Sequence, residues 1–176
     1  WLLVGPPDLH ATSADDNVWS RTWDHVARLV RLAGELGGGT LVFGSPLQRA
    51  SRGELPHVAA MERFLEGLRP VADRALEAGC RILLESLSSE RTDILNTMEE
   101  VRHTIRRFDH PAVQTVFDFH NMHDETMSWE ELINEYSTLI SHVHLNELDG
   151  GPPTPESRDL AAFRRACAAL RETGYD

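Results

Sequence analysis

The chain has 176 residues, of which 41% are hydrophobic and 26% are charged, and its formal net charge is −11. These values are typical of a soluble globular protein that is long enough for one domain with a buried core. Because Lys and Arg contacts to phosphate supply most of the affinity for DNA and RNA, the acidic balance argues against nucleic acid as a partner. No apolar run approaches the roughly 18 residues of a membrane span, and no secretory leader opens the chain, so we expect a cytoplasmic protein without a membrane partner.

Short apolar runs alternate with longer amphipathic segments along the chain. The apolar runs predict five strands, at residues 2–4, 40–43, 81–85, 113–118 and 140–145. The amphipathic segments predict five helices, at residues 17–36, 55–78, 93–108, 128–139 and 159–173. Asp15 or Asp16 can cap the first helix, and Ser128 with Glu131 forms a capping box for the fourth.

The alternation of strands and helices predicts an α/β fold of five βα units with a parallel sheet. The strands are nearly continuous apolar runs, as expected where both faces of a sheet are covered. Right-handed crossovers leave two architectures open, a doubly wound open sheet and part of a (β/α)8 barrel. No linker divides the chain, so we expect a single domain over residues 1–176. Segment 149–157 is the longest expected loop and should overhang the end of the fifth strand.

Three residues of metal-ligand type stand at the ends of three successive predicted strands: Glu85, Asp118 and His144. Because the carboxyl ends of parallel strands meet at one edge, where such folds bind ligands, we expect these side chains to converge. Two carboxylates and an imidazole suit a divalent metal ion. Taken singly, each residue has an alternative role: an ion pair for Glu85, a helix cap or turn for Asp118, and core packing for His144.

Two further candidates lie at the same edge. His142 shares a strand face with His144 and could orient the metal or the substrate, or pack in the core. Arg49 follows the turn at residues 44–46 and could bind an anionic or polyhydroxyl substrate, or be a solvated side chain beside a tight turn.

The chain lacks the motifs of several other enzyme classes. It has no Gly-x-Gly-x-x-Gly after a strand, no P-loop and no Gly-x-Ser-x-Gly elbow. Its two cysteines, Cys80 and Cys167, form no Cys-x-x-Cys pair, and we expect both to be reduced packing residues.

Several stretches resemble the xylose isomerase-like (β/α)8 TIM barrels, which form the sugar phosphate isomerase/epimerase superfamily. The matching stretches span nearly the whole chain and lie at residues 83–85, 94–97, 116–121, 142–147, 152–153 and 174–176. The spacing of Glu85, Asp118 and His144 is similar to that of the ketose 3-epimerase branch.

This resemblance implies a metal-dependent proton transfer. Family members hold Mn²⁺, Mg²⁺ or Co²⁺, in preference to Zn²⁺, with Glu, Asp, His and a second Glu, and the two glutamates move a proton through an enediolate. Carried over, Glu85 is both a metal ligand and the catalytic acid/base, and Asp118 and His144 are metal ligands. His120 or Asn121 would contact substrate hydroxyls.

The sequence also departs from the family pattern. The resemblance places the start of the chain near the third barrel strand, so we expect about five of the eight βα units. It places the second Glu beyond Asp176, so we expect a chain that binds metal weakly and is catalytically impaired. Asn121 stands where the epimerase branch has the His of Asp-x-x-His, and Gly150 stands where it has a substrate-binding Arg.

The resemblance therefore predicts a sugar or sugar-phosphate isomerase or epimerase of carbohydrate metabolism, with a small-molecule partner and with homo-oligomers left open. A metal-dependent cyclitol or sugar dehydratase of the same superfamily and a non-catalytic barrel domain are the alternatives. The zinc apurinic endonucleases of the superfamily need a basic surface, which the net charge of −11 opposes.

Overall fold

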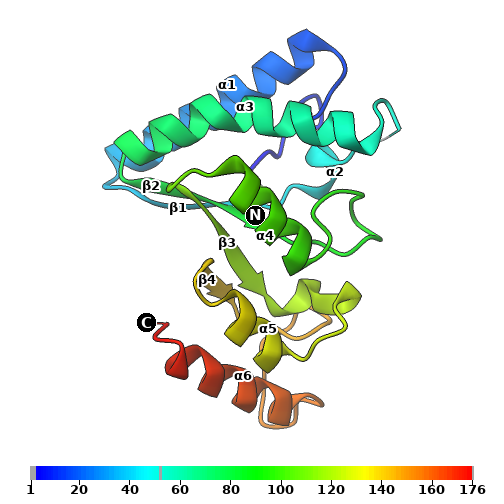
Figure 1. Ribbon diagram of the computed structural model, residues 1–176, viewed down its shortest axis with the longest axis vertical. Helices are drawn as coiled ribbons and strands as arrows, with labels where there is room; N and C mark the ends of the chain where they lie inside the picture. The colour runs from blue at the N-terminus through cyan, green and yellow to red at the C-terminus, as the bar shows by residue number, and fades with distance from the viewer. Residues whose placement is uncertain (1–2, 52, 176) are drawn as a thin grey trace.

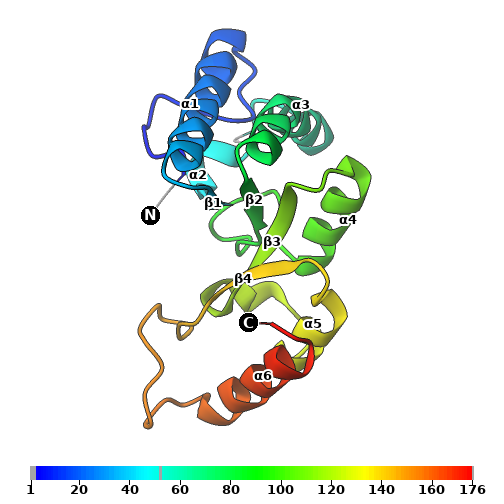
Figure 2. The ribbon, with the colours of Figure 1, turned by 90° about the vertical axis from the view of Figure 1, so that its left-hand side faces the viewer.

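The computed structural model describes residues 3–51 and 53–175. Within these residues, four parallel strands form one sheet in the order β1-β2-β3-β4. The strands are β1 (Gly39–Phe43), β2 (Cys80–Glu85), β3 (Val113–Asp118) and β4 (Ile140–His144). Figure 2 shows them curling through the middle of the molecule with the helices around their outer side, which is the shape of a half-barrel.

The helices connect successive strands and divide into two groups. They are α1 (Asp16–Glu35), α2 (Pro46–Arg49), α3 (His57–Glu77), α4 (Met98–Phe108), the 3₁₀ helix η1 (Phe119–Asp124), α5 (Trp129–Tyr136) and α6 (Leu160–Glu172). The long helices α1 and α3 lie side by side over β1 and β2, and α5 and α6 lie together at the opposite end, beside β4 (Figure 1). Among the described residues, none of the helices is long and apolar enough to cross a membrane.

The core forms two clusters on the outer face of the sheet. The larger cluster packs β1 and β2 against α1 and α3, with Trp23, Phe43 and Phe64 in mutual ring contact. The smaller cluster packs β3 against α5 and α6 around Phe119 and Phe163. Because alternate strand residues point to opposite faces, this packing leaves the other face of β2, β3 and β4 to carry polar groups.

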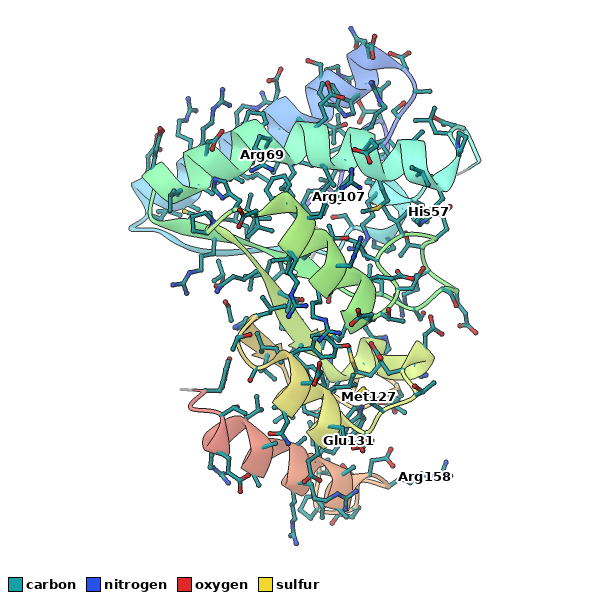
Figure 3. All side chains as sticks on the ribbon, in the orientation of Figure 1. His57, Arg69, Arg107, Met127, Glu131 and Arg158 are labelled. Carbon is teal, nitrogen blue, oxygen red and sulfur yellow. The ribbon has the colours of Figure 1, made fainter. Side chains whose placement is uncertain are left out.

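Arginine side chains extend the contact between α3 and α4. Arg69 donates to the backbone oxygen of Phe108 and its guanidinium lies 3.8 Å from the centre of that ring. Arg107 pairs with Glu62 at the surface of the same contact. Figure 3 shows Arg69 and Arg107 in the seam between the two helices.

Most of the expected elements are confirmed, and their ends follow the local signals. Strand β3 has the predicted bounds, residues 113–118. The Asp15 side chain accepts from two backbone N–H groups of α1, and the capping box of Ser128 and Glu131 is formed at α5. Cys80 and Cys167 are both free thiols, as expected.

Two expected elements are corrected by the structure. Leu3 and Val4 form a bend instead of the predicted first strand, because the Val4 N–H donates to the Ser45 hydroxyl rather than to a neighbouring strand. Leu2, the other residue of that strand, lies outside the described residues. The helix expected at 93–108 begins only at Met98, because Leu95 has a φ of 58° and Thr97 provides the cap.

A close contact between α3 and α1 gives a first prediction. A Cβ at Gly67 would lie 2.0 Å from Nε1 of Trp23, so this helical glycine makes room for the indole ring. Replacing glycine by alanine inside a helix usually stabilises it by about 0.5–1 kcal/mol. Here we expect Gly67→Ala to lower the free energy of unfolding by about 1–3 kcal/mol in urea titrations, because it overpacks the core.

The neighbouring variant Glu66→Ala is the control, because Glu66 is exposed on the same helix. It should change the free energy of unfolding by less than about 0.5 kcal/mol. A stabilising effect of Gly67→Ala would contradict the packing described for Trp23.

Candidate metal centre

The side chains of Glu85, Asp118 and His144 meet at the carboxyl ends of β2, β3 and β4. Each offers a ligand atom, and these atoms all lie within 4.8 Å of one another. Nδ1 of His144 lies 2.9 Å from Oδ2 of Asp118 and 3.8 Å from Oε1 of Glu85. Glu85 and Asp118 are 8% and 6% exposed, whereas His144 is half-buried. The structure thus brings together the three residues that the sequence placed at successive strand ends.

An irregularity in the sheet decides that His144 joins this cluster. Thr115 pairs with Ile140, but the next residue, Val116, pairs with His142, so Ser141 is an extra residue in β4. Without this bulge, Asp118 would pair with Val143, and His144 would point to the opposite face of the sheet. The observed register pairs Asp118 with His144 and places both side chains on the inner face.

The Glu85 carboxylate is fixed from two sides. The Asn121 side chain donates a hydrogen bond to Oε1 over 3.1 Å. On the other side, Oε2 packs against the backbone of Gly44, where a Cβ would lie only 2.1 Å away. Gly44 follows β1, so the neighbouring strand end leaves room for the carboxylate, and any larger residue there would displace it.

A backbone N–H two residues further along the chain fixes the Asp118 carboxylate. Oδ1 accepts the backbone N–H of His120 over 3.0 Å, and that N–H also donates to the side-chain oxygen of Asn146 over 2.9 Å. Oδ2 remains directed at His144. Hydrogen bonds of this kind orient the carboxylate for a metal ion, and losing one typically weakens metal binding by about 10- to 100-fold.

The electrostatics of the cluster favour a bound cation. Burial, a hydrogen bond shared with Asp118 and the charge of Asp118 together raise the pKa of Glu85 to about 7. Burial also disfavours the charged form of Asp118, but hydrogen bonds from His144 and with Glu85 outweigh it and lower its pKa. The hydrogen bond to Asp118 raises the pKa of His144. Two buried carboxylates and one imidazole therefore fit a divalent ion, which would neutralise the charge that burial penalises.

Arg49 does not lie where the sequence suggested. Its side chain is fully buried, and its guanidinium donates to the backbone oxygens of Phe43, Ile94 and Leu95. Burial lowers its pKa to about 10, although the nearby charge of Glu85 acts in the opposite direction. The predicted contact of Arg49 with a substrate is wrong, because its side chain is buried where it joins β1 to the loop after β2.

The remaining candidates surround the cluster in different ways. Asn121 is buried and bonded to Glu85, as described above. His120 is partly exposed, and its Nε2 lies 3.0 Å from a guanidinium nitrogen of Arg91. His142 stands next to His144, with ring centres 5.1 Å apart, and burial and the charge of His144 lower its pKa.

Two supporting residues escaped the sequence-based reasoning. Gly44 was interpreted only as part of a turn, although its place at the end of β1 puts it at the same edge as Glu85. Asn146 lies two residues after His144 and shares the His120 N–H with Asp118. Gly44 and Asn146 both follow the ends of strands, and this position in the sequence is the signal that could have identified them.

Comparisons with known proteins agree with this geometry. Residues 2–176 match the model of the xylose isomerase-like TIM barrel family. The chain therefore belongs to this family, as the sequence resemblance implied. A D-psicose 3-epimerase of Ruminiclostridium cellulolyticum is 26% identical over 153 residues, which cover 87% of this chain and 50% of the relative.

Solved structures of sugar epimerases share the fold. An L-ribulose 3-epimerase superposes with a TM-score of 0.83 at 25% identity over 97% of this chain and 56% of its own. A 3-keto-D-glucoside 4-epimerase from E. coli gives a TM-score of 0.78 at 20% identity over 98% of this chain and 66% of its own. The chain spans about half the length of the curated relative that it matches.

The burial of Glu85 predicts a pH-dependent effect on stability. The pKa of Glu85 is about 7 in the folded protein, compared with an ordinary value of 4.5 that applies to the unfolded chain. The folded protein therefore binds this proton more tightly than the unfolded chain does. Ionisation of Glu85 therefore destabilises the metal-free protein progressively as the pH rises from about 4.5 to 7. We expect Glu85→Gln, which cannot ionise, to exceed the native protein in unfolding free energy at pH 8 by on the order of 2–3 kcal/mol.

This difference should nearly vanish at pH 4, where Glu85 is protonated in both states. Urea unfolding in the presence of a chelator at both pH values measures it. A difference that is the same at pH 4 and pH 8 would mean that Glu85 is not the buried ionising group.

The contact between Gly44 and Glu85 predicts a loss of metal affinity. An alanine Cβ at position 44 would occupy the place of Oε2 and turn the carboxylate away from Asp118. We expect Gly44→Ala to weaken Mn²⁺ binding in calorimetric titrations by roughly 10- to 100-fold, the range for loss of a supporting contact. Gly5→Ala is the control, because no atom lies within 4 Å of a Cβ there. Equal Mn²⁺ affinity in the two variants would refute this role of Gly44.

Proposed function

We propose that this protein is a divalent-metal-dependent sugar isomerase or epimerase that moves a proton on a ketose through an enediolate. The observation that carries the proposal is the convergence of Glu85, Asp118 and His144 within 4.8 Å at one edge of a parallel sheet. Relatives of this chain are sugar 3-epimerases. Ketose epimerisation needs a stabilised negative charge and a positioned base, and this cluster can supply both.

The three residues have distinct proposed roles. Glu85, Asp118 and His144 hold the ion, which we expect to be Mn²⁺, Mg²⁺ or Co²⁺ because carboxylate oxygens make up most of the donor set. A bound ion of this kind polarises a carbonyl and stabilises the negative charge that develops on its oxygen.

Glu85 is the proposed proton-transfer residue. In the metal-free protein, burial and Asp118 raise its pKa to about 7. A bound cation would lower this pKa and leave the carboxylate ionised, which is the form that acts as a general base. Asn121 fixes one carboxylate oxygen, and Gly44 lets the other approach the strand end. The buried setting keeps water from competing for the carboxylate.

Epimerisation at a carbon needs a second group that returns the proton from the opposite face. Within residues 3–51 and 53–175, no further Asp, Glu, His or Cys joins the three ligands. The family resemblance assigns this second role to another glutamate, so a complete epimerase site needs a carboxylate from outside the described residues.

Metal loading and product analysis test the proposal together. The protein is stripped of metal, reloaded with Mn²⁺, Mg²⁺, Co²⁺ or Zn²⁺, and incubated with a panel of ketoses and ketose phosphates. We expect Asp118→Asn to reduce Mn²⁺ affinity by at least roughly 100-fold and to abolish conversion, because it removes a buried charged ligand. Asp109→Asn is the matched control, since Asp109 is an exposed residue with a φ of 48° that asparagine tolerates.

The mass of the product separates the reaction classes. An isomer or epimer keeps the mass of the substrate, whereas a dehydratase product is lighter by one water. Failure of every metal to bind at Glu85, Asp118 and His144 would refute the proposed site. Metal binding with neither conversion of a ketose nor exchange of a substrate C–H proton with D₂O would indicate a non-catalytic barrel domain, because exchange needs one base whereas epimerisation needs two groups.

A further inference from the structure

Arg91 contacts His120, which in turn contacts Asp118 of the candidate metal centre, and Arg91 has no acidic partner among residues 3–51 and 53–175. It is exposed in the loop between β2 and α4, which begins directly after Glu85. In the described part of the chain, no carboxylate oxygen lies within 4.0 Å of its guanidinium, and the recorded side-chain contact is the one with Nε2 of His120 over 3.0 Å. An arginine held by an imidazole keeps its full charge available to a ligand.

The loop around Arg91 is held in place by its own hydrogen bonds. The Arg91 N–H donates to the backbone oxygen of Ser88 over 2.9 Å. The Asn96 side chain donates to the backbone oxygens of Leu87 and Thr92, on either side of Arg91. These bonds place Arg91 at the tip of a tight loop whose backbone is fixed before any ligand arrives.

His120 connects Arg91 to the metal ligands. A guanidinium can only donate hydrogen bonds, so Nε2 of His120 must accept, and the ring proton lies on Nδ1. Nδ1 is buried and has no hydrogen-bond partner within the described residues, and Gly150 lies over that side of the ring. The backbone N–H of the same His120 donates to Asp118. His120 is thereby a positioning residue for Arg91, and its ring has no accessible nitrogen left for a substrate hydroxyl.

The carboxylates near this loop bond to backbone N–H groups, so the Arg91 guanidinium is available to an external anion. Asp124 accepts the backbone N–H of Ser89, which belongs to the same loop as Arg91, and Asp149 accepts the backbone N–H of Gly151 within its own loop. Neither carboxylate forms an ion pair with the Arg91 guanidinium in the described part of the chain. The planar guanidinium presents several N–H donors that match the oxygens of a phosphate or a carboxylate. In a chain of net charge −11, a cation without an acidic partner at the rim of the site is suited to select an anionic ligand.

We propose that Arg91, positioned by His120, binds an anionic group carried by the substrate, either a phosphate ester or a carboxylate, while the reacting carbons lie at Glu85, Asp118 and His144. This inference rests on the proposed function, since it assigns the substrate class for the same site. It selects phosphorylated or acidic ketoses over the neutral sugars named for the relatives.

Binding of non-reacting probes tests this selectivity apart from catalysis. Calorimetric titrations in Mn²⁺ and low salt compare xylitol, xylitol 5-phosphate and xylonate. We expect at least one anionic probe to bind roughly 10- to 100-fold more tightly than xylitol, the range for a charge-assisted hydrogen bond. Because the xylonate carboxylate can also bind Mn²⁺, the probe whose gain is lost in Arg91→Gln identifies the anionic group as phosphate or carboxylate.

The variants separate a specific contact from general charge. Arg91→Gln should abolish the preference for the anionic probe over xylitol. Arg106→Gln, an exposed arginine on α4, removes the same charge and should preserve the preference. His120→Ala should reduce the preference, and His120→Gln, whose side-chain oxygen can still accept from Arg91, should restore most of it.

The results also distinguish this inference from the proposed function. Equal affinity for the neutral and anionic probes, no binding of either anionic probe, or an equal loss in Arg91→Gln and Arg106→Gln would overturn the role of Arg91. None of these outcomes depends on turnover. Absence of both conversion and D₂O exchange for every ketose, with the Arg91-dependent preference intact, would instead refute the enzymatic proposal and leave the anion site standing.

Discussion

The burial of two carboxylates beside one imidazole is the constraint on which this site depends. Glu85 and Asp118 are almost inaccessible, and their ligand atoms lie within 4.8 Å of each other and of His144. Without a cation, the cluster lowers its charge by holding a proton on Glu85, whose pKa is about 7. Burying these carboxylates therefore lowers the stability of the metal-free fold. A bound cation would relieve this cost, which increases the affinity of the site for the ion.

This constraint explains the identity of the surrounding residues. A carboxylate that must stay buried and correctly aimed needs a donor on one oxygen and space beside the other, which Asn121 and Gly44 provide. Arg49 adds a buried positive charge near Glu85, and it joins β1 to the loop that follows β2. The arginine that the sequence suggested as a substrate ligand is thus part of the scaffold, and its charge acts on Glu85 from a distance.

The parts of the structure that could be predicted from the sequence are those with a local cause. Apolar runs located β3 to the residue, and the Ser128 capping box located α5. The ligand residues followed from strand ends alone. The convergence of His144 was expected from its strand end, but the extra residue in β4 that turns its side chain toward Asp118 could not be predicted, because it depends on register with β3. The burial of Arg49 escaped for the same reason, since two of its acceptors lie 45 and 46 residues away.

His120 contacts both the candidate metal ligands and the arginine of the proposed anion site. His120 holds Arg91 through its ring and Asp118 through its backbone N–H, so a shift of one contact changes the geometry of the other. An anion that draws Arg91 toward the cluster pulls on His120, and an ion that fixes Asp118 restrains the same peptide. Linkage then requires that each ligand change the affinity for the other by the same factor. Such coupling would let a charged substrate reinforce a metal site that has only three ligands among the described residues.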